Sequence, residues 1–263
     1  MINLVKELYK NRKLIMDMSK SDFKSRYSGS YFGTVWAIVQ PLMTILIFWF
    51  VFQVGFRSRP ISNVPFILWL CCGMIPWNFF ADAVINGTGA FTSYSFVVKK
   101  LVFKIELLPL VKVIGSFFLN IAFNGLLILI FTLYGMFPGI QLLQILYYNI
   151  CMFMIITAIS YLTATLNVFF RDMSQIVGIL LQFGIWLTPI MWQEIMIPET
   201  YRWIIKLNPI YYIINGYREA LINGTWFYNH MYQTIYFWGV TASLFIIGML
   251  FFKKMKPHFA DVL

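Results

Sequence analysis

Six long apolar runs constrain this chain more than any other feature of its sequence. They cover about residues 35–56, 64–86, 109–134, 142–170, 174–192 and 233–252. A helix needs about 20 apolar residues to cross a hydrocarbon layer ~30 Å thick, and a helix satisfies its own backbone hydrogen bonds inside that layer. The runs therefore predict an all-α integral membrane protein with six transmembrane helices.

Composition excludes the soluble alternative. Of 263 residues, 60% are hydrophobic and 11% are charged, against about 45–50% apolar and about 25% charged in a soluble domain. The formal charge is +10, but no basic run is interleaved with aromatic residues as a nucleic-acid surface requires. We expect membrane lipid, and not nucleic acid, beside the basic residues.

The distribution of Lys and Arg predicts the orientation. If the N-terminus is inside and all six runs span, the inside segments carry 15 Lys and Arg residues and the outside segments carry five. Basic residues concentrate on the cytoplasmic side of membrane proteins. We therefore predict that both termini are cytoplasmic.

Two segments outside the runs have amphipathic patterns. In residues 2–24 apolar side chains recur at about 3.5-residue spacing between lysines, and residues 95–106 repeat the pattern with Val97, Leu101 and Ile105. Both patterns predict helices along the cytoplasmic face. Each helix either lies on lipid or forms a docking surface for a cytoplasmic partner.

Residues 193–230 are too polar to span a membrane and too apolar for a free loop. Prolines, asparagines and glycines interrupt short apolar runs here. The pattern favours two short half-helices that enter the membrane and return, which is tolerated where protein or a water-filled cavity covers the backbone. An ordinary extracellular loop with interfacial helices is the alternative.

These segments form one predicted transmembrane domain over 1–263. Its parts are a cytoplasmic amphipathic interface helix at 1–28, a six-helix bundle at 35–252, a cytoplasmic segment at 93–108, a re-entrant segment at 193–230 and a cytoplasmic tail at 253–263.

The sequence carries no recognisable catalytic chemistry. A phosphate-binding loop is absent, the two histidines are isolated, and no cluster has metal-ligand spacing. Asp82 is the only acid within a predicted span and lies near its cytoplasmic end. We expect no catalytic residue, no metal and no cofactor on this chain.

Six motifs in order resemble one family, the permease subunits of ATP-binding cassette exporters for lipid-linked surface polysaccharides such as O-antigen, capsule and wall teichoic acid. They are RYxxSxxGxxWAxxQP at 26–41, GMIPWxFF at 73–80 with VKK at 98–100, NVFFRD at 167–172, WLTPI at 186–190, NPxYYxxxGYR at 208–218 and PHFADVL at 257–263. Together they extend over nearly the whole chain.

The resemblance implies a homodimer bound to two copies of a cytoplasmic ATPase subunit, which would hold ATP and Mg, in a bacterial cell membrane. It implies an N-terminal interface motif with Arg26, Tyr27, Gly33 and Pro41. It implies coupling to the ATPase through Val97, Lys99, Lys100, Leu101, Lys104, Arg171 and Asp172. It implies a re-entrant outer gate with Pro189, Pro198, Asn208, Pro209, Tyr211 and Arg218.

Physical reasoning adds candidates for the transport path. A two-fold dimer supplies more wall for a wide polymer path than one six-helix bundle does. Aromatic faces can stack on the C–H faces of sugars without fixing one register, and aromatic residues make up 19% of the chain. The candidates are Trp36, Phe48, Phe52, Phe79, Phe183 and Trp186. Helix packing or lipid contact is the alternative for each of them.

The predicted function is export of a polyprenyl-linked polysaccharide from the cytoplasmic to the outer face of the membrane, by a transport subunit that is not an enzyme. A permease for drugs or small lipids is the nearest alternative, and the tail at 259–263 with Arg26 and Tyr27 favours glycan export. An ion-coupled transporter needs ionisable residues at mid-membrane, and a polyprenyl-phosphate enzyme needs grouped carboxylates. The sequence provides neither.

Overall fold

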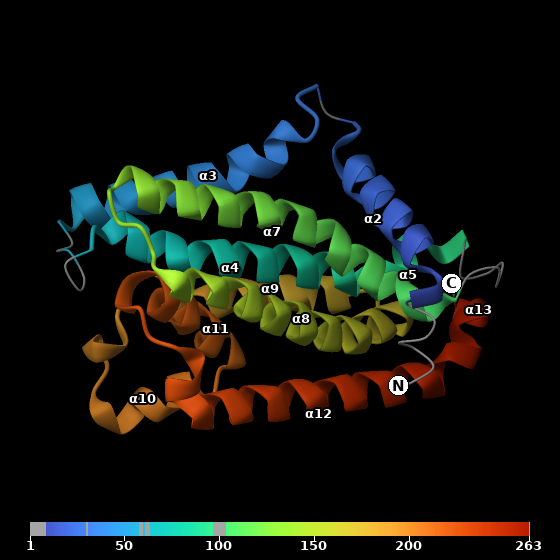
Figure 1. Cartoon of the computed structure of the whole chain (residues 1–263). Helices are drawn as coiled ribbons and strands as arrows, with labels where there is room; N and C mark the ends of the chain where they lie inside the picture. The colour runs from blue at the N-terminus through green and yellow to red at the C-terminus, as the bar shows by residue number, and fades with distance from the viewer. Residues whose placement is uncertain (1–8, 30, 58–59, 61–63, 97–103, 263) are drawn as a thin grey trace.

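A computed structural model describes residues 9–29, 31–57, 60, 64–96 and 104–262. Every element in these ranges is helical, and none of them is a strand (Figure 1). The longer helices are α2 (Arg12–Tyr27), α3 (Val35–Trp49), α4 (Phe66–Thr88), α7 (Leu108–Leu133), α8 (Gln144–Phe169), α9 (Met173–Leu187), α10 (Glu199–Lys206), α11 (Pro209–Arg218) and α12 (Met231–Met255). The short elements are α5 (Ala90–Ser93), α13 (Phe259–Val262), the 3-10 turns η2 (Ile105–Leu107), η3 (Ile140–Leu143), η4 (Glu194–Met196), η6 (Phe227–His230) and η7 (Lys256–His258), and the π-helical turns η1 (Phe50–Gly55) and η5 (Glu219–Asn223).

Five helical stretches of the described chain are long and apolar enough to cross a membrane. They are Val35–Gly55, Phe66–Thr88, Ile105–Leu133, Ile140–Phe169 and Phe227–His258. These confirm a multi-pass, all-helical membrane protein.

The run predicted at 174–192 forms a shorter helix than expected. Apolar α9 covers Met173–Leu187, which is 15 residues. It ends because Thr188, the residue before Pro189, is extended (φ −93°, ψ 132°), the conformation that a following proline favours.

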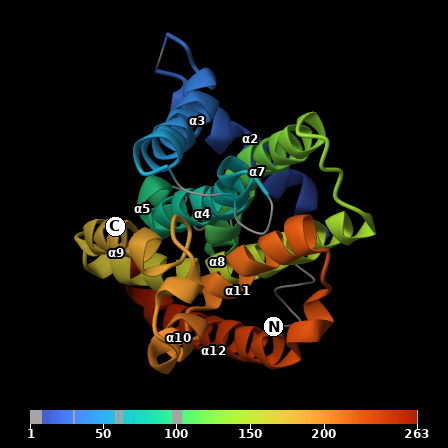
Figure 2. The ribbon, with the colours of Figure 1, turned by 90° about the vertical axis from the view of Figure 1, so that its left-hand side faces the viewer.

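The bundle surrounds α4, which contacts α3, α7, α8, α9 and α11. Helices α7 and α8 lie against it, and α12 covers α8 on the far side (Figures 1 and 2). The main apolar core runs between α4, α7, α8 and α11, and a second cluster joins α5, the ends of α7, α8 and α12, and α13. Helices α2, α5 and α13 lie at one end of the bundle, and α10 and α11 lie at the other (Figure 1).

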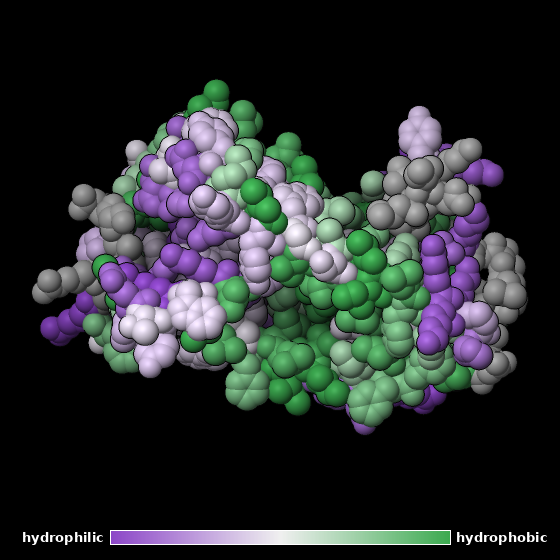
Figure 3. All heavy atoms as spheres, turned by 90° about the horizontal axis from the view of Figure 1, so that it is seen from below, coloured by the Kyte–Doolittle hydropathy of each residue, from purple (hydrophilic) through white to green (hydrophobic). Residues whose placement is uncertain are grey.

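The outer surface fits a membrane. Apolar side chains cover the middle of the face seen in Figure 3, and hydrophilic side chains gather toward its two ends. Lipid contact explains why so many large apolar side chains are exposed, for example Ile235, Ile247 and Leu250 on α12.

Helix α3 leans away from the bundle, at the top of Figure 1. A turn connects it to α2, and Gly33 in this turn has φ +53°, a conformation that glycine adopts without strain. Pro41 lies inside α3, where it removes one helical hydrogen bond and favours a bend.

The segment predicted to be cytoplasmic differs from its expected structure. A single amphipathic helix over 95–106 is wrong at its C-terminal end: Lys104 has an extended conformation, and the buried Ile105 begins a 3-10 turn into α7. The reason is that Pro109, close to the start of α7, favours a new helix there. The predicted coupling residues Val97, Lys99, Lys100 and Leu101 lie outside the described residues.

Two short helices, α10 and α11, occupy the segment predicted to be re-entrant. The Asn208 side chain caps α11 by accepting a hydrogen bond from the backbone N–H of Ile210, and Pro209 occupies the first turn. Asn208 also donates to the Thr188 hydroxyl at 2.8 Å. This contact fixes the start of α11 to the end of α9, so two of the sequence motifs dock onto each other.

Candidate functional site

One face of the molecule is formed by α3 and α9 with α4 between them, and we call it the α3–α4–α9 face. Helix α4 contacts both flanking helices, which lie on either side of it in Figure 2. Large apolar side chains on α3 and α9 are exposed here: Trp36, Ile47, Phe183 and Trp186 are 46%, 56%, 64% and 56% exposed. Such a surface is covered either by lipid or by another protein.

A groove of about 220 Å³ opens between α3, α4 and α7. Its lining is unusually polar for membrane depth, with Gln40, Thr44, Asn78, Asp82 and Asn120. Among the described residues, the buried amide nitrogen of Asn78 has no hydrogen-bond partner. Polar groups at this depth normally face the bundle interior or a water-filled cavity, so the groove is better suited to a polar cargo than to lipid.

The six aromatic candidates for the transport path fall on these elements. Trp36 and Phe79 line the groove, and Phe183 and Trp186 are exposed on α9. Phe48 and Phe52 are half-buried, and the ring of Phe52 lies 5.8 Å from that of Phe66. Three of the six rings, those of Trp36, Phe183 and Trp186, are thus exposed on α3 and α9, while the ring of Phe79 packs against Phe117.

A cluster of buried charges fastens α2 to the bundle. The Asp22 carboxylate receives hydrogen bonds from Lys112 at 2.5 Å and from Arg26 at 2.7 Å. Arg26 also donates to Ser116 at 3.0 Å and lies 3.5 Å from Asp82. Asp22 is 4% exposed, so these partners offset the cost of burying its charge.

The electrostatics of this cluster favour the charged form of Asp22. Burial by itself raises the pKa of this carboxyl group. The hydrogen bonds and positive charges of Lys112 and Arg26 outweigh burial, and the net pKa lies below its usual value. Asp22 is therefore ionised at neutral pH and holds two cations from different elements.

At the same end of the bundle, the turn between α8 and α9 exposes Arg171 and Asp172. Asn167 precedes this turn and links α8 to two other helices. It accepts a hydrogen bond from Ser174 of α9 at 3.0 Å and donates one to Thr92 of α5 at 3.4 Å. Lys104, which precedes η2, is exposed as well. The turn thus joins the end of α8 to the start of α9.

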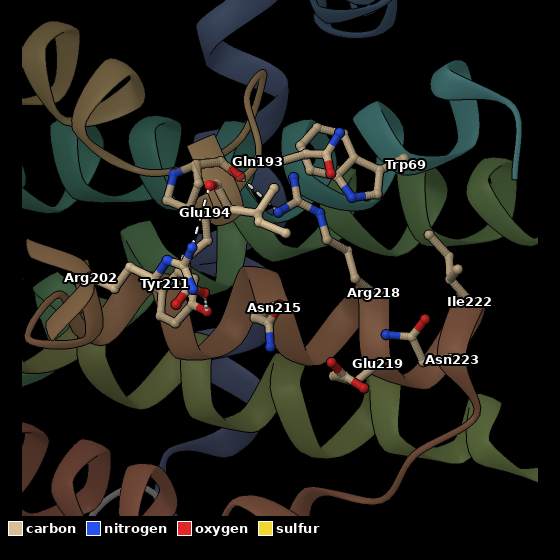
Figure 4. Close-up of a pocket in the computed structure, with 12 residues that line it drawn as sticks. Trp69, Gln193, Glu194, Arg202, Tyr211, Asn215, Arg218, Glu219, Ile222 and Asn223 are labelled. Atoms are coloured by element: carbon tan, nitrogen blue, oxygen red, sulfur yellow. Dashed lines mark hydrogen bonds between the residues drawn. The ribbon is translucent and has the colours of Figure 1, made fainter. Parts of the chain in front are cut away.

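At the opposite end, three of the predicted gate residues, Pro189, Tyr211 and Arg218, line one cavity, and Figure 4 shows the last two of them. The buried Arg218 donates to the carbonyl oxygens of Pro189 at 2.7 Å and Ile190 at 3.0 Å, and its guanidinium lies 3.6 Å from the centre of the Trp69 ring. Tyr211 donates to the Glu194 carboxylate. Pro198 precedes α10 and is exposed.

Sequence reasoning missed Asp22 and Trp69. The signal for Asp22 was available, since Asp22 and Arg26 are four residues apart on a predicted helix and such pairs interact. Trp69 carried no signal, because its role depends on Arg218 from a distant helix. Among the described residues, no group of three or more His, Cys, Asp or Glu side chains could hold a metal ion.

The fold and these sites define a polytopic membrane protein with charged anchoring at one end and an exposed face along α3 and α9. The family described as ABC-2 type transporter matches residues 14–222 of the chain. The chain belongs to this family. It is the membrane permease of an ABC-2 exporter, a transport subunit and not the ATPase.

Curated relatives of this chain include O-antigen export system permease proteins. Two O-antigen export system permease proteins RfbA from Klebsiella pneumoniae are 32% identical over 251 residues and 30% identical over 256 residues, covering 95% of this chain and of each relative. The protein of the same name from Myxococcus xanthus is 28% identical over 240 residues, covering 88% of this chain and 86% of the relative.

Proposed function

We propose that this permease exports a polysaccharide linked to a polyprenyl lipid, from the cytoplasmic to the outer face of a bacterial cell membrane. The observation that carries the proposal is 32% identity to an O-antigen export permease over 95% of both chains. The six motifs, the polar groove and the exposed aromatic rings of the α3–α4–α9 face support the same cargo.

We propose further that the working unit is a homodimer with the α3–α4–α9 faces directed toward a common axis. Two observations support this arrangement. The polar groove is lined mainly by α3, α4 and α7, so two of the three helices of this face supply polar groups at membrane depth, whereas the exposed residues of α12 include aliphatic ones suited to lipid. A two-fold axis here would place the rings of Trp36, Phe183 and Trp186 from both copies around one path.

Energy would come from two copies of a separate ATPase that binds ATP and Mg. We place its contact at the end that carries α2, α5 and α13, so both chain termini would be cytoplasmic, in line with the excess of Lys and Arg on that side. The N-terminal motif of Arg26, Tyr27, Gly33 and Pro41 would hold α2 as the interface helix. The turn at Arg171 and Asp172 would receive the push.

The outer segment 193–230 would act as the gate. Its helices α10 and α11 are short, and α11 is buried against α4 and α8. Non-helical backbone at membrane depth is tolerated where protein covers it, and the contacts of Arg218 with Pro189 and Ile190 provide such cover.

ATPase and export assays on one complex test this proposal. The chain is purified with its ATPase in lipid, with and without the polyprenyl-linked glycan, and export is followed as surface polysaccharide in cells. We expect hydrolysis only in the complex, stimulation by the glycan, and loss of that stimulation in Arg171→Ala. Lys254→Ala, at an exposed position near the end of α12, is the control. Two results together would refute the proposal. The glycan would not change the ATPase activity of the complex, and cells that lack this gene would still export the glycan.

A further inference from the structure

At the end of the bundle opposite α2, a cavity of about 520 Å³ lies between α4, α10, α11 and the segment after α9 (Figure 4). This volume is in the range of small-molecule binding sites, about 300–1,000 Å³. The cavity lies apart from the groove between α3, α4 and α7 and shares no lining residue with it.

The lining of this outer cavity combines amides, which donate and accept hydrogen bonds, with carboxylates, which accept them. Asn215, Glu219 and Asn223 line it at four-residue spacing, which places them on one side of the continuous helical stretch formed by α11 and η5. Gln193 and Glu194 face them from the segment after α9. This alternation of amides and carboxylates suits a ligand with many hydroxyl groups.

The charges of the cavity argue against an anionic ligand. Two guanidinium groups line it, but both are occupied: Arg218 binds the carbonyl oxygens of Pro189 and Ile190. Arg202 donates to the carbonyl oxygen of Ile197 at 3.0 Å and lies 3.5 Å from the Glu199 carboxylate. A phosphate or an acidic sugar would meet the carboxylate of Glu219, and the nearby cations are already paired, since Arg202 lies beside Glu199 and Lys206 lies 3.6 Å from Glu194.

One buried donor in the wall has no partner. Arg218 is 6% exposed, and its Nε atom makes no hydrogen bond to any of the described residues. A buried donor without a partner costs free energy. Trp69 does not stack on the ligand, because Arg218 covers one face of its ring and the ring of Phe66 stacks on it at 5.9 Å.

We propose that this cavity binds an uncharged saccharide unit of the exported polymer as it leaves the permease. This proposal rests on the proposed function, because its ligand is a unit of the same exported polysaccharide. Hydrogen bonds recognise the saccharide in this cavity, whereas stacking on aromatic rings contacts it along the α3–α4–α9 face. A site of this kind at the exit would hold the emerging chain between strokes and reduce back-sliding.

Binding is measured on the full-length chain with its ATPase in lipid nanodiscs. The probes are the repeat-unit oligosaccharide released by mild acid from the host's surface polysaccharide and a size-matched neutral glucan oligomer. The test variant combines Glu219→Gln with Asn223→Ala, and Glu219→Gln keeps an acceptor for the Thr225 hydroxyl. The control is Asn229→Ala, also exposed but outside the cavity.

We expect the repeat unit to bind more tightly than the glucan, and the double variant to weaken that binding about tenfold or more, with the control unchanged. A photoreactive residue at Ile222, which lines the cavity, should capture the repeat unit, whereas one at Tyr232 should not. Equal binding by all variants, or no binding while cells still export the polymer, overturns the cavity as a saccharide site and leaves the proposed function standing. If the cavity binds no repeat unit and cells that lack this gene still export the polymer, both the saccharide site and the proposed function are rejected.

Discussion

Helix α4 and the stretch formed by α3 and η1 are neighbours of similar length, 23 and 21 residues, with opposite environments. In the apolar stretch of α4, 78% of the residues are buried and the mean hydropathy is 1.4. In the stretch formed by α3 and η1, 11% are buried and the mean hydropathy is 2.1. The more hydrophobic helix is therefore the more exposed one. In a membrane, high hydropathy marks contact with lipid or with another protein, while interior helices can carry small and polar residues.

Close packing explains the composition of the interior helix. A side chain at Gly87 of α4 would place its Cβ 2.1 Å from the Ser160 hydroxyl of α8. At Gly55, which ends the α3 stretch, no atom lies within 4 Å of such a Cβ. The glycine in α4 serves helix–helix contact, and the one beyond α3 does not.

Truncating one tryptophan on each helix gives the largest expected difference. Trp77 of α4 is 5% exposed and Trp36 of α3 is 46% exposed. Trp77→Ala should lower the free energy of unfolding by about 3–5 kcal/mol, and Trp36→Ala should change it by less than about 0.5 kcal/mol while slowing export. Thermal unfolding in detergent and surface polysaccharide are the two readouts. Equal destabilisation by both variants would remove the contrast between the helices.

Breaking the charge cluster beneath α2 is expected to have the next largest effect. Asp22→Asn leaves Lys112 buried without its carboxylate partner and should cost about 3 kcal/mol. Protease cleavage between α2 and α3 in the purified chain should then accelerate. Asp17→Asn on the same helix is the control, because Asp17 is exposed. Unchanged cleavage in Asp22→Asn would show that the cluster does not hold α2.

The same cluster predicts a pH dependence. The pKa of Asp22 in the folded protein lies below its ordinary value of 3.8. Its contribution to stability is therefore fully present above pH ~4 and is lost as the pH falls through the lower, folded value. Protease sensitivity of α2 should stay constant from neutral pH to about pH 5 and rise only in strongly acid solution. A transition near pH 6 would point to another group.

Adding one methyl group to each helix is expected to have a smaller effect. Gly87→Ala should destabilise the bundle by about 1–3 kcal/mol, because Ser160 must move. Gly55→Ala should have almost no effect on the unfolding temperature. If the two alanine variants unfold at the same temperature, the tight contact between α4 and α8 is absent.

The smallest expected effect belongs to the tail. Lys256 pairs with Glu106 at 2.9 Å, and both side chains are partly exposed. Lys256→Gln should therefore cost about 0.2–1 kcal/mol, measured by thermal unfolding. Phe259, 1% exposed between the rings of Phe91 and Phe252, keeps the tail in place. A large loss in Lys256→Gln would mean that the ion pair, and not the aromatic packing, anchors the tail.

Helical class and multi-pass character were predictable because run length and charge content reflect the solvent that surrounds the chain. The orientation, with both termini cytoplasmic, stays a prediction. Which helices are interior and which are peripheral was not predictable. The sequences of α3 and α4 both have the length and apolar character of a transmembrane helix, and only their tertiary contacts distinguish them.

The candidate sites differ in the same way: some features are local in the sequence, and others depend on tertiary contacts. The motif at Asn208 and Pro209 could be read locally, as a helix cap followed by a proline. The contacts of Arg218 with Trp69 and Pro189, and of Lys112 with Asp22, join residues far apart in the sequence. Their spacing carries no signal, so the sequence indicated these residues only through family resemblance, or not at all.

Chemical cross-linking between two copies of the chain tests most directly whether the α3–α4–α9 face meets its counterpart at a dimer axis. The native cysteines Cys71, Cys72 and Cys151 are buried, so single cysteines can be introduced at Ile47 on α3, Phe183 on α9 and Leu250 on α12, which are 56%, 64% and 63% exposed. With a bifunctional maleimide in native membranes, we expect covalent dimers for Ile47→Cys and Phe183→Cys and none for Leu250→Cys. Dimers through Leu250→Cys alone would contradict the arrangement.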